Sequence, residues 1–419
     1  MEKLSPHDLI TLLLAISTML IFSRIASELG KRIGLPMVMG ELIVGVVLGP
    51  TVFGAIAPGL YGTVFPFAEN SHFSLALDTI FSLSVILLLF VVGLELRFSL
   101  FLRHGRTAIF TGFGSMVLPF MSGFTLAWFF PQWFFVVKDG PSHLLFALFL
   151  GTAMSISALP VIARILLDLK LLKSEIGAVI IASAVFNDVV GWIVFSFILS
   201  LVNKNSGGGS VLQSLASITA FAFFMLVAGR FVLNRILPWI QTKLSWPGGV
   251  LSFSLSLCLV CAAFTEFIRI HAILGAFIAG LAIGDSVHFR EQAREIMHQF
   301  VTNFFAPLFF VSIGLKVNFI EHFDLAVATV VLLLAFSGKI IGAGIGARLG
   351  GMSSRNSLAV AFGLNARGAM EIILGSLAYD AGLINHSVFV ALIIMALVTS
   401  ITSAPLMRLF LDRKHSIRH

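Results

Sequence analysis

Apolar stretches long enough to cross a membrane follow one another along almost the whole chain, and this pattern restricts the fold more than any other feature. Windows of about 19 residues identify them. The thirteen candidate spans run approximately over 8–29, 36–56, 74–96, 106–130, 142–167, 172–202, 211–236, 248–268, 271–287, 297–316, 323–349, 355–380 and 385–411. Only 11% of the residues are charged, whereas a soluble domain carries about 25%. Because lipid offers no hydrogen-bond partners to the backbone, we expect an all-α polytopic membrane protein with about 13 transmembrane helices.

The basic residues are distributed unevenly between the two sides of this predicted topology. With the N-terminus outside, twenty of the 27 Lys and Arg residues fall at the inner side and five at the outer side. An excess of Lys and Arg in cytoplasmic loops is what a correct topology produces. We therefore expect a multi-pass protein of the cell inner (plasma) membrane with a cytoplasmic C-terminus. The net charge of +7 then requires no nucleic acid as a partner.

Three shorter observations complete the organisation of the chain. The first span lacks a small-residue cleavage pattern, so we expect it to be retained rather than removed as a signal peptide. The stretch 203–210 (NKNSGGGS) is typical of a flexible linker. Cys258 and Cys261 lie in an apolar helix without further ligands, so we expect two buried thiols rather than a redox or metal site.

A glycine pattern repeats between the second and the ninth predicted span. The stretches 40–49 (GELIVGVVLG) and 275–284 (GAFIAGLAIG) carry glycine at three equivalent positions, and 90–96 (FVVGLEL) resembles 311–317 (VSIGLKV) in the same way. Because the offset is an odd number of spans, the second copy would be inverted. We therefore expect two inverted six-helix repeats joined by span seven. Chance recurrence of glycine at helix crossings is the alternative.

The sixth span contains a carboxylate, Asp188, near its middle, with Asn187 beside it. A carboxylate at that depth costs about 2.5 kcal/mol or more unless it faces protein or water, so Asp188 is a candidate functional residue. Asn187 adds an uncharged oxygen ligand and a donor. Burial penalises the charged form of a carboxylate, so Asp188 is expected to hold either a proton or a cation.

The fifth span, and its repeat partner the twelfth, both contain helix-breaking residues. Pro160 follows a stretch rich in hydroxyls, 151–159 (GTAMSISAL). A proline removes a backbone donor, and the freed carbonyls can then face an ion. The twelfth span contains 363–371 (GLNARGAME), with two glycines. Irregular backbone at membrane depth needs protein or water to satisfy it, so we expect two broken, crossing helices near Asp188.

Four further ionisable residues lie well inside predicted spans. Arg367 and Glu371, four residues apart, are expected to form a structural or gating ion pair. Lys339, in the middle of the eleventh span, is expected to approach Asp188 or the broken helices as a charge partner. Glu41 is expected to stabilise the protein or to line the cytoplasmic entrance.

The expected ligands of a bound cation are all oxygen atoms, which suits a hard monovalent ion. They come from Asp188 and Asn187, from the hydroxyls of Ser155 and Ser157, and more weakly from Thr152 and Ser183. No cofactor is expected, and the ions that bind are predicted to be Na⁺ or K⁺ and H⁺.

In their joint order these motifs resemble the monovalent cation:proton antiporters of the CPA superfamily, and most closely its CPA2 branch of bacterial sodium/potassium:proton exchangers and plant cation/H⁺ exchangers. The resemblance rests on Asn187-Asp188, the stretch 155–164 (SISALPVIAR), Lys339 and the pattern Asn-x-Arg-Gly-x-x-Glu at 365–371, supported by 93–96 and 309–315. It implies the NhaA/NapA-like antiporter fold and no enzymatic activity.

The resemblance also implies a homodimer with an elevator-type alternating-access mechanism. The implied domains are scaffold and dimer helices 1–3 (1–103), core helices 4–6 (104–202), linker helix 7 (203–246), scaffold and dimer helices 8–10 (247–320) and core helices 11–13 (321–419). Asn187 in place of a second aspartate is the pattern associated with electroneutral exchange, whereas Lys339 occurs in electrogenic members. A monovalent cation channel and a non-transporting membrane sensor on the same scaffold are the alternatives.

Overall fold

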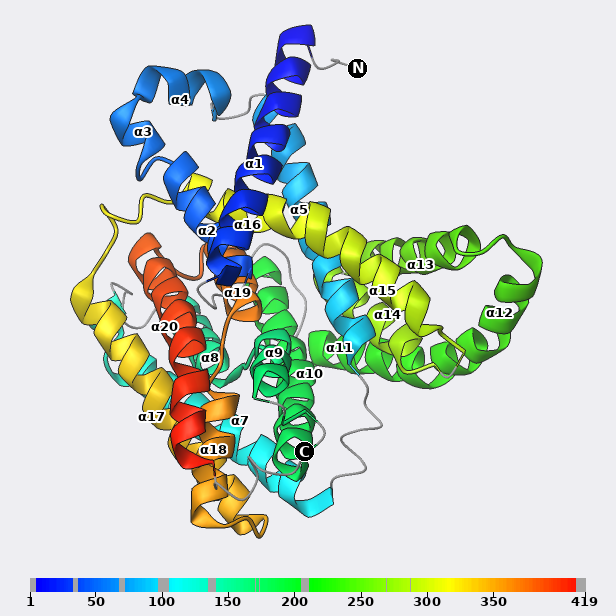
Figure 1. The fold of residues 1–419 in the computed structure, drawn as a ribbon, viewed down its shortest axis with the longest axis vertical. Helices are drawn as coiled ribbons and strands as arrows, with labels where there is room; N and C mark the ends of the chain where they lie inside the picture. The colour runs from blue at the N-terminus through cyan, green and yellow to red at the C-terminus, as the bar shows by residue number, and fades with distance from the viewer. Residues whose placement is uncertain are drawn as a thin grey trace. The chain divides into compact units, whose positions relative to one another are not determined.

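The computed structural model describes residues 5–32, 37–67, 72–96, 105–134, 141–169, 171–172, 174–204, 211–268, 270–286 and 288–411. Within these ranges all regular structure is helical (Figure 1). The α-helices are α1 (Pro6–Arg32), α2 (Met37–Leu48), α3 (Phe53–Ile56), α4 (Pro58–Val64), α5 (His72–Glu95), α7 (Gly105–Phe129), α8 (Pro141–Ser155), α9 (Leu159–Asp168), α10 (Glu175–Lys204), α11 (Val211–Phe224), α12 (Arg230–Lys243), α13 (Gly248–Phe267), α14 (Ala272–Gly284), α15 (Glu291–Phe300), α16 (Ala306–Lys316), α17 (Leu325–Leu349), α18 (Ser354–Leu364), α19 (Ala369–Asp380) and α20 (His386–Phe410). A 3₁₀-helix, η1 (Pro131–Phe134), and two π-helical turns, η2 (Met225–Gly229) and η3 (Val301–Phe305), complete them.

Ten helical segments of the described residues are long and apolar enough to cross a membrane, or eleven if the bent pair α18–α19 is one span. Two shorter apolar helices, His143–Ser155 and Ala272–Gly284, lie within the fifth and ninth predicted spans. The prediction of a multi-span helical membrane protein is therefore confirmed.

Some predicted boundaries differ from the helices. The second predicted span, 36–56, corresponds to the apolar segment Met37–Ile56, within which α2 ends at Leu48 before Pro50, a residue that cannot donate to a preceding turn. The seventh span is longer than predicted, since α11, η2 and α12 follow one another without interruption as far as Lys243. Of the predicted linker 203–210, residues 205–210 lie outside the described residues.

The chain divides into two compact units, each built from both halves of the sequence. One unit comprises residues 1–96 and 220–322, and the other comprises residues 97–219 and 323–419. The first unit contains α1–α5 and α12–α16, and the second contains α7–α10 and α17–α20.

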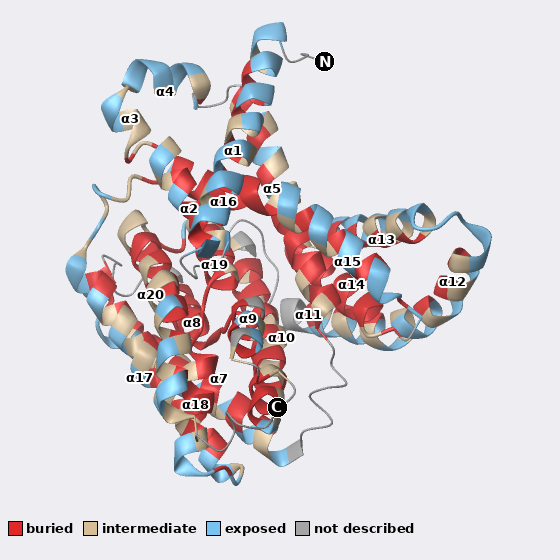
Figure 2. Cartoon of the chain, viewed as in Figure 1, coloured by how far each residue is buried: buried red, intermediate tan, exposed pale blue. Residues whose placement is uncertain are grey.

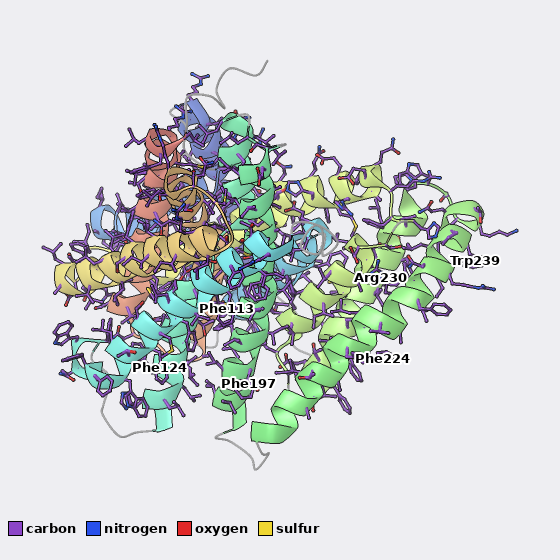
Figure 3. The ribbon with its side chains drawn as sticks, turned by 90° about the horizontal axis from the view of Figure 1, so that it is seen from below. Phe113, Phe124, Phe197, Phe224, Arg230 and Trp239 are labelled. Atoms are coloured by element: carbon purple, nitrogen blue, oxygen red, sulfur yellow. The ribbon has the colours of Figure 1, made fainter. Side chains whose placement is uncertain are left out.

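Glycines bring the backbones of the first unit together at two helix pairs, α2 with α16 and α5 with α14. A Cβ atom added to Gly49 would lie 2.1 Å from the carbonyl oxygen of Gly314, and one added to Gly280 would lie 2.1 Å from that of Phe90. Small residues permit this approach between membrane helices. Figure 2 shows α14 buried along nearly its whole length. By contrast, the rings of Phe224 and Trp239 project outward from the α11–α12 segment (Figure 3).

In the second unit, α7 and α17 pack closely through Gly114 and Gly342, where an added Cβ at Gly342 would lie 2.2 Å from the carbonyl oxygen of Gly114. Two membrane-depth segments of this unit are interrupted. The chain leaves helical conformation between α8 and α9, and again between α18 and α19, whose axes differ by 47°. Helix α10 packs against α7, α8, α9 and α18.

Candidate functional site

The candidate site lies within the second unit, where α10 carries Asn187 and Asp188 near its middle. Both side chains are completely buried. Neither carboxylate oxygen of Asp188 has a hydrogen-bond partner among the described residues. Burying an ionised carboxylate is costly unless it is paired, coordinated or neutralised. Asp188 is therefore a buried acceptor suited to a proton or a cation.

The side-chain amide of Asn187 joins α10 to two other elements. Its Nδ2 donates to Ser115 Oγ of α7 at 2.8 Å and to Ser157 Oγ, between α8 and α9, at 3.4 Å. Ser115 was not among the predicted site residues. The signal that could have found it is a hydroxyl in the fourth span, beside the glycines Gly112 and Gly114 that let α7 pack closely.

The two helix breaks are hydrogen-bonded to each other. The Ala158 amide donates to the carbonyl oxygen of Ala366 at 3.0 Å, and Ser157 Oγ donates to that of Leu364 at 3.0 Å. Since Ser157 also accepts from Asn187, the first break is hydrogen-bonded directly to α10, and the second is joined to α10 through Ser157. The structure thus brings Asn187 and Ser157 together, as the sequence predicts.

Two buried cations occupy the carbonyl end of α8. Arg367 donates from Nη1 to the Ala153 carbonyl oxygen at 2.7 Å and from Nη2 to that of Met154. Lys339 Nζ donates to the carbonyl oxygen of Ser155. A helix C-terminus carries unpaired carbonyls and the negative end of the helix dipole, so cations are stabilising there. The carbonyls that the sequence analysis assigns to an ion accept hydrogen bonds from Arg367 and Lys339 instead.

The predicted pair of Arg367 and Glu371 is present, with Arg367 Nη1 lying 3.4 Å from Glu371 Oε2. Both side chains are buried. The two residues do not share a helix, because Arg367 lies in the break and Glu371 in the first turn of α19. The carboxylate thus lies at the N-terminal end of α19, beside the Arg367 guanidinium. Lys339 interacts electrostatically with Asp188, Arg367 and Glu371.

The hydroxyls of the other predicted ligands, Thr152, Ser155 and Ser183, donate hydrogen bonds to backbone carbonyl oxygens. Thr152 Oγ1 donates to the Leu148 carbonyl at 2.7 Å, and Ser155 Oγ donates to the Thr152 carbonyl at 2.8 Å. Ser183 Oγ donates to the carbonyl of Ala108 on α7 at 3.2 Å. All three are buried. Each oxygen keeps lone pairs, but the hydrogen bonds of Ser183 direct it to α7 rather than to Asn187.

Several buried polar residues outside the predicted ligand set have unpaired atoms, Asn365 and Glu41 among them. Both side-chain amide atoms of Asn365, at the end of α18, lack a hydrogen-bond partner among the described residues. In the first unit, Glu41 is 3% exposed and its Oε2 likewise has no partner in the described part of the chain. Cys258 and Cys261 are free, buried thiols. The described residues contain no cluster of three or more His, Cys, Asp or Glu side chains that could hold a metal ion.

Comparison with protein families identifies the family of this chain. The family model described as "Sodium/hydrogen exchanger, transmembrane" matches residues 15–409. The chain belongs to the sodium/hydrogen exchanger family. The resemblance to cation:proton antiporters is therefore confirmed, and so is the expectation of a transporter rather than an enzyme, since this is a family of transporters.

The relatives of this chain include named antiporters. The chain is 32% identical over 411 residues to Cation/H(+) antiporter 20 of Arabidopsis thaliana, covering 94% of this chain and 48% of that protein. It is 30% identical over 405 residues to the Na(+)/H(+) antiporter NhaS4 of Synechocystis, covering 95% of this chain and 97% of that protein. The chain spans about half the length of the plant relatives it matches.

The fold also has a solved counterpart. The sodium proton antiporter MjNhaP1 from Methanocaldococcus jannaschii matches 95% of this chain and 96% of its own with a TM-score of 0.64 at 17% sequence identity. This likeness shows a shared antiporter fold. In this chain, that fold carries a buried aspartate without a hydrogen-bond partner among the described residues, two helix breaks that are hydrogen-bonded to each other and two buried cations within one unit.

Proposed function

We propose that this protein exchanges a monovalent cation, Na⁺ or K⁺, for protons across the membrane, with Asp188 binding the two ions in competition. The observation that carries the proposal is the completely buried Asp188 carboxylate, whose two oxygens lack partners among the described residues. Such a group requires a proton or a cation for neutralisation. Family membership and the names of the relatives support the same reaction.

The proposed cation ligands are oxygen atoms near the crossing of the two breaks. Asp188 supplies the charge, and the side-chain oxygens of Asn187 and Ser157 are supported by their hydrogen-bonded contact. Ser155 and Thr152, in the last turn of α8, follow as further ligands. Ser183 remains the least supported member of the set because its hydroxyl is engaged with α7.

The charges of the site support an electroneutral exchange. Four buried ionisable groups, Asp188, Glu371, Lys339 and Arg367, sum to zero formal charge when all are ionised. A proton on Asp188 and a monovalent cation bound to Asp188 each raise the sum by one. The two loaded states then carry equal net charge, so one-for-one exchange moves no net charge across the membrane. Release of a proton from Lys339 during the cycle would break this balance.

We further propose thirteen spans arranged as two inverted repeats, counting α8–α9, α14 and the bent pair α18–α19 as spans. The repeat is supported by equivalent glycine contacts: α2 meets α16 and α14 meets α5, and these helices are exchanged by the proposed symmetry. The unit of residues 97–219 and 323–419 is the proposed moving core of an elevator mechanism, and the other unit is the scaffold. A homodimer in the plasma membrane, with the N-terminus outside, completes the proposal.

Proteoliposomes with an internal pH dye test the function. Na⁺, K⁺ and Li⁺ are added in turn, with the membrane potential clamped and unclamped, to wild-type protein, Asp188→Asn and a matched surface control, Asp8→Asn. We expect a cation-dependent pH change that is insensitive to voltage, retained in the control and lost in Asp188→Asn. Cation-dependent proton movement in well-folded Asp188→Asn would refute the role of Asp188. Single-channel currents would favour the channel alternative.

A further inference from the structure

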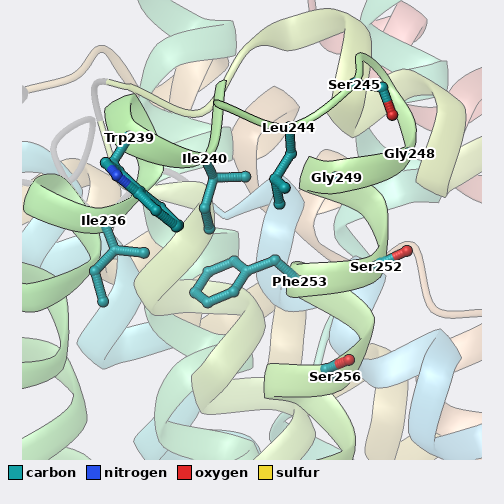
Figure 4. Close-up of a pocket in the computed structure, with 10 residues that line it drawn as sticks. All are labelled: Ile236, Trp239, Ile240, Leu244, Ser245, Gly248, Gly249, Ser252, Phe253 and Ser256. Atoms are coloured by element: carbon teal, nitrogen blue, oxygen red, sulfur yellow. The ribbon is translucent and has the colours of Figure 1, made fainter. Parts of the chain in front are cut away.

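A groove in the first unit, distant in sequence from the proposed ion site, combines an apolar floor with basic residues at its end. It lies between α12 and α13 and has a volume of about 690 Å³. Ile236, Ile240 and Leu244 line one side, and Phe253 lines the other; Figure 4 shows the Phe253 ring turned toward Ile240. The floor is thus made of side chains that suit an acyl chain.

The sequence of α12 places a positive charge on the same face as this apolar floor. Ile236, Trp239 and Ile240 are spaced so that they share one side of the helix, and Lys243 continues the same stripe one turn later. Lys243 is exposed and lies in the last turn of α12, beside the turn that leads into α13. A molecule lying along the groove would therefore have its polar end near the ammonium group.

A second cation lies at the same end of the groove. The Arg290 guanidinium stacks over the Trp246 ring, with Cζ 5.0 Å from the ring centroid, and Trp246 belongs to the turn between α12 and α13. Among the described residues, neither Lys243 nor Arg290 forms an ion pair, whereas nearby Arg230 is paired with Asp285 at 2.7 Å. The sequence from 189 to 265 contains no Asp or Glu, and Glu291, which follows Arg290, is paired with Arg294 at 3.0 Å. The groove end is therefore a local excess of positive charge.

Two exposed tryptophans at this end of the groove are typical of residues at the boundary between lipid and water. Trp239 is 59% exposed and Trp246 is 38% exposed. Tryptophan is enriched at that boundary because its ring is amphipathic. Ser245, which also lines the groove there, offers a hydroxyl.

We propose that this groove binds an anionic glycerophospholipid of the leaflet that the α12–α13 turn faces. One acyl chain lies on Ile236, Ile240 and Phe253, and the phosphate is held by Lys243 and Arg290. Basic residues near a membrane surface attract anionic headgroups, and the apolar floor distinguishes a lipid from free phosphate. The proposal is independent of the ion-exchange reaction.

Lipid binding to purified protein in detergent tests the proposal. Native mass spectrometry measures the affinity for phosphatidylglycerol and for phosphatidylcholine, and the same samples are titrated with inorganic phosphate. The variants are Lys243→Ala/Arg290→Ala, which removes two charges from the groove, and Lys31→Ala/Arg32→Ala, which removes two exposed charges from the end of α1. Ser256→Trp places a large ring in the groove without altering its charge.

We expect phosphatidylglycerol to bind wild-type protein more tightly than phosphatidylcholine does. The groove double variant should bind phosphatidylglycerol about 30-fold more weakly, from about 1 kcal/mol for each basic residue, while the α1 variant keeps wild-type affinity. Ser256→Trp should weaken the binding of both lipids. Equal affinity for the two lipids, an equal loss in the α1 variant, or displacement of the lipid by inorganic phosphate alone would overturn the proposal. Dimers that dissociate when the groove is blocked would assign it to a second copy of the chain instead.

Discussion

Replacing Arg367 by methionine removes a cation that three buried acceptors share, which makes it a severe test of how the second unit is held together. The guanidinium is completely buried and donates to the carbonyl oxygens of Ala153 and Met154 and to Glu371. Methionine fills a similar volume without any donor. The substitution therefore leaves a buried carboxylate uncompensated and two helix-terminal carbonyls unpaired.

The expected loss follows from these contacts. Removing one partner of a buried ion pair costs about 3–5 kcal/mol of the free energy of unfolding. Each carbonyl left unpaired adds to that loss, with about 1–3 kcal/mol for a fully desolvated group. Since these contributions overlap, we expect Arg367→Met to lower the free energy of unfolding by about 4–5 kcal/mol.

Equilibrium unfolding in mixed detergent micelles at alkaline pH measures this loss. The matched control is Arg408→Met, which removes an exposed arginine from the last turn of α20 in the same unit and should change stability by less than about 0.5 kcal/mol. In the double variant Arg367→Met/Glu371→Gln the uncompensated charge is absent, so its loss should be at least about 2 kcal/mol smaller than the sum of the two single losses. Equal losses for Arg367→Met and Arg408→Met, or strict additivity in the cycle, would refute the reasoning.

Three further predictions each test a different feature of the structure: a hydrogen bond of Asn187, a glycine contact between helices, and the charge of the proposed site. Ser115→Ala removes a hydrogen-bond acceptor of Asn187 and should raise the KM for the cation about 5-fold in proteoliposome assays, from a hydrogen bond worth about 1 kcal/mol. Ser183→Ala should raise this KM less, because the Ser183 hydroxyl is bonded to α7. Gly280→Ala should lower thermal stability strongly, because its Cβ would lie 2.1 Å from the Phe90 carbonyl oxygen, while Gly62→Ala on α4 has no atom within 4 Å and should be neutral; equal stability of the two would contradict the packing described. Asn187→Asp adds a second carboxylate to the site, so exchange should become sensitive to membrane potential, and voltage-independent exchange by this variant would argue against the charge balance proposed.

The sequence predicts the helical membrane class well because hydropathy alone determines it. A long apolar run such as the one around Asp188 forms a helix in lipid, because a helix pairs its backbone donors and acceptors internally. The two broken segments were also predictable, since Pro160 and the glycines around Arg367 interrupt a helix by local chemistry. Boundaries were less accurate: the seventh predicted span ends at residue 236, whereas the helical segment continues to Lys243.

The contacts of the site were only partly accessible from the sequence. The sequence predicts Asn187 and Ser157 as ligands of one site, and the structure has a hydrogen bond between their side chains. The partner of Lys339 could not be chosen from sequence, because a buried ammonium group can pair with a carboxylate or with helix-terminal carbonyls, and only the position of α8 decides between them. Ser115 and Asn365 escaped prediction since one hydroxyl or amide in an apolar span is commonly bonded within its own helix.

The central claim is that one carboxylate, Asp188, holds either a proton or a cation. Isothermal titration calorimetry of the purified protein tests it directly, with the transported cation as titrant, in buffers of different ionisation enthalpy and over a range of pH. The account predicts release of about one proton for each cation bound, a Kd that rises about tenfold for each unit of pH below the pKa of the site, and loss of both effects in Asp188→Asn. Cation binding that releases no proton and keeps the same Kd across that range would contradict it.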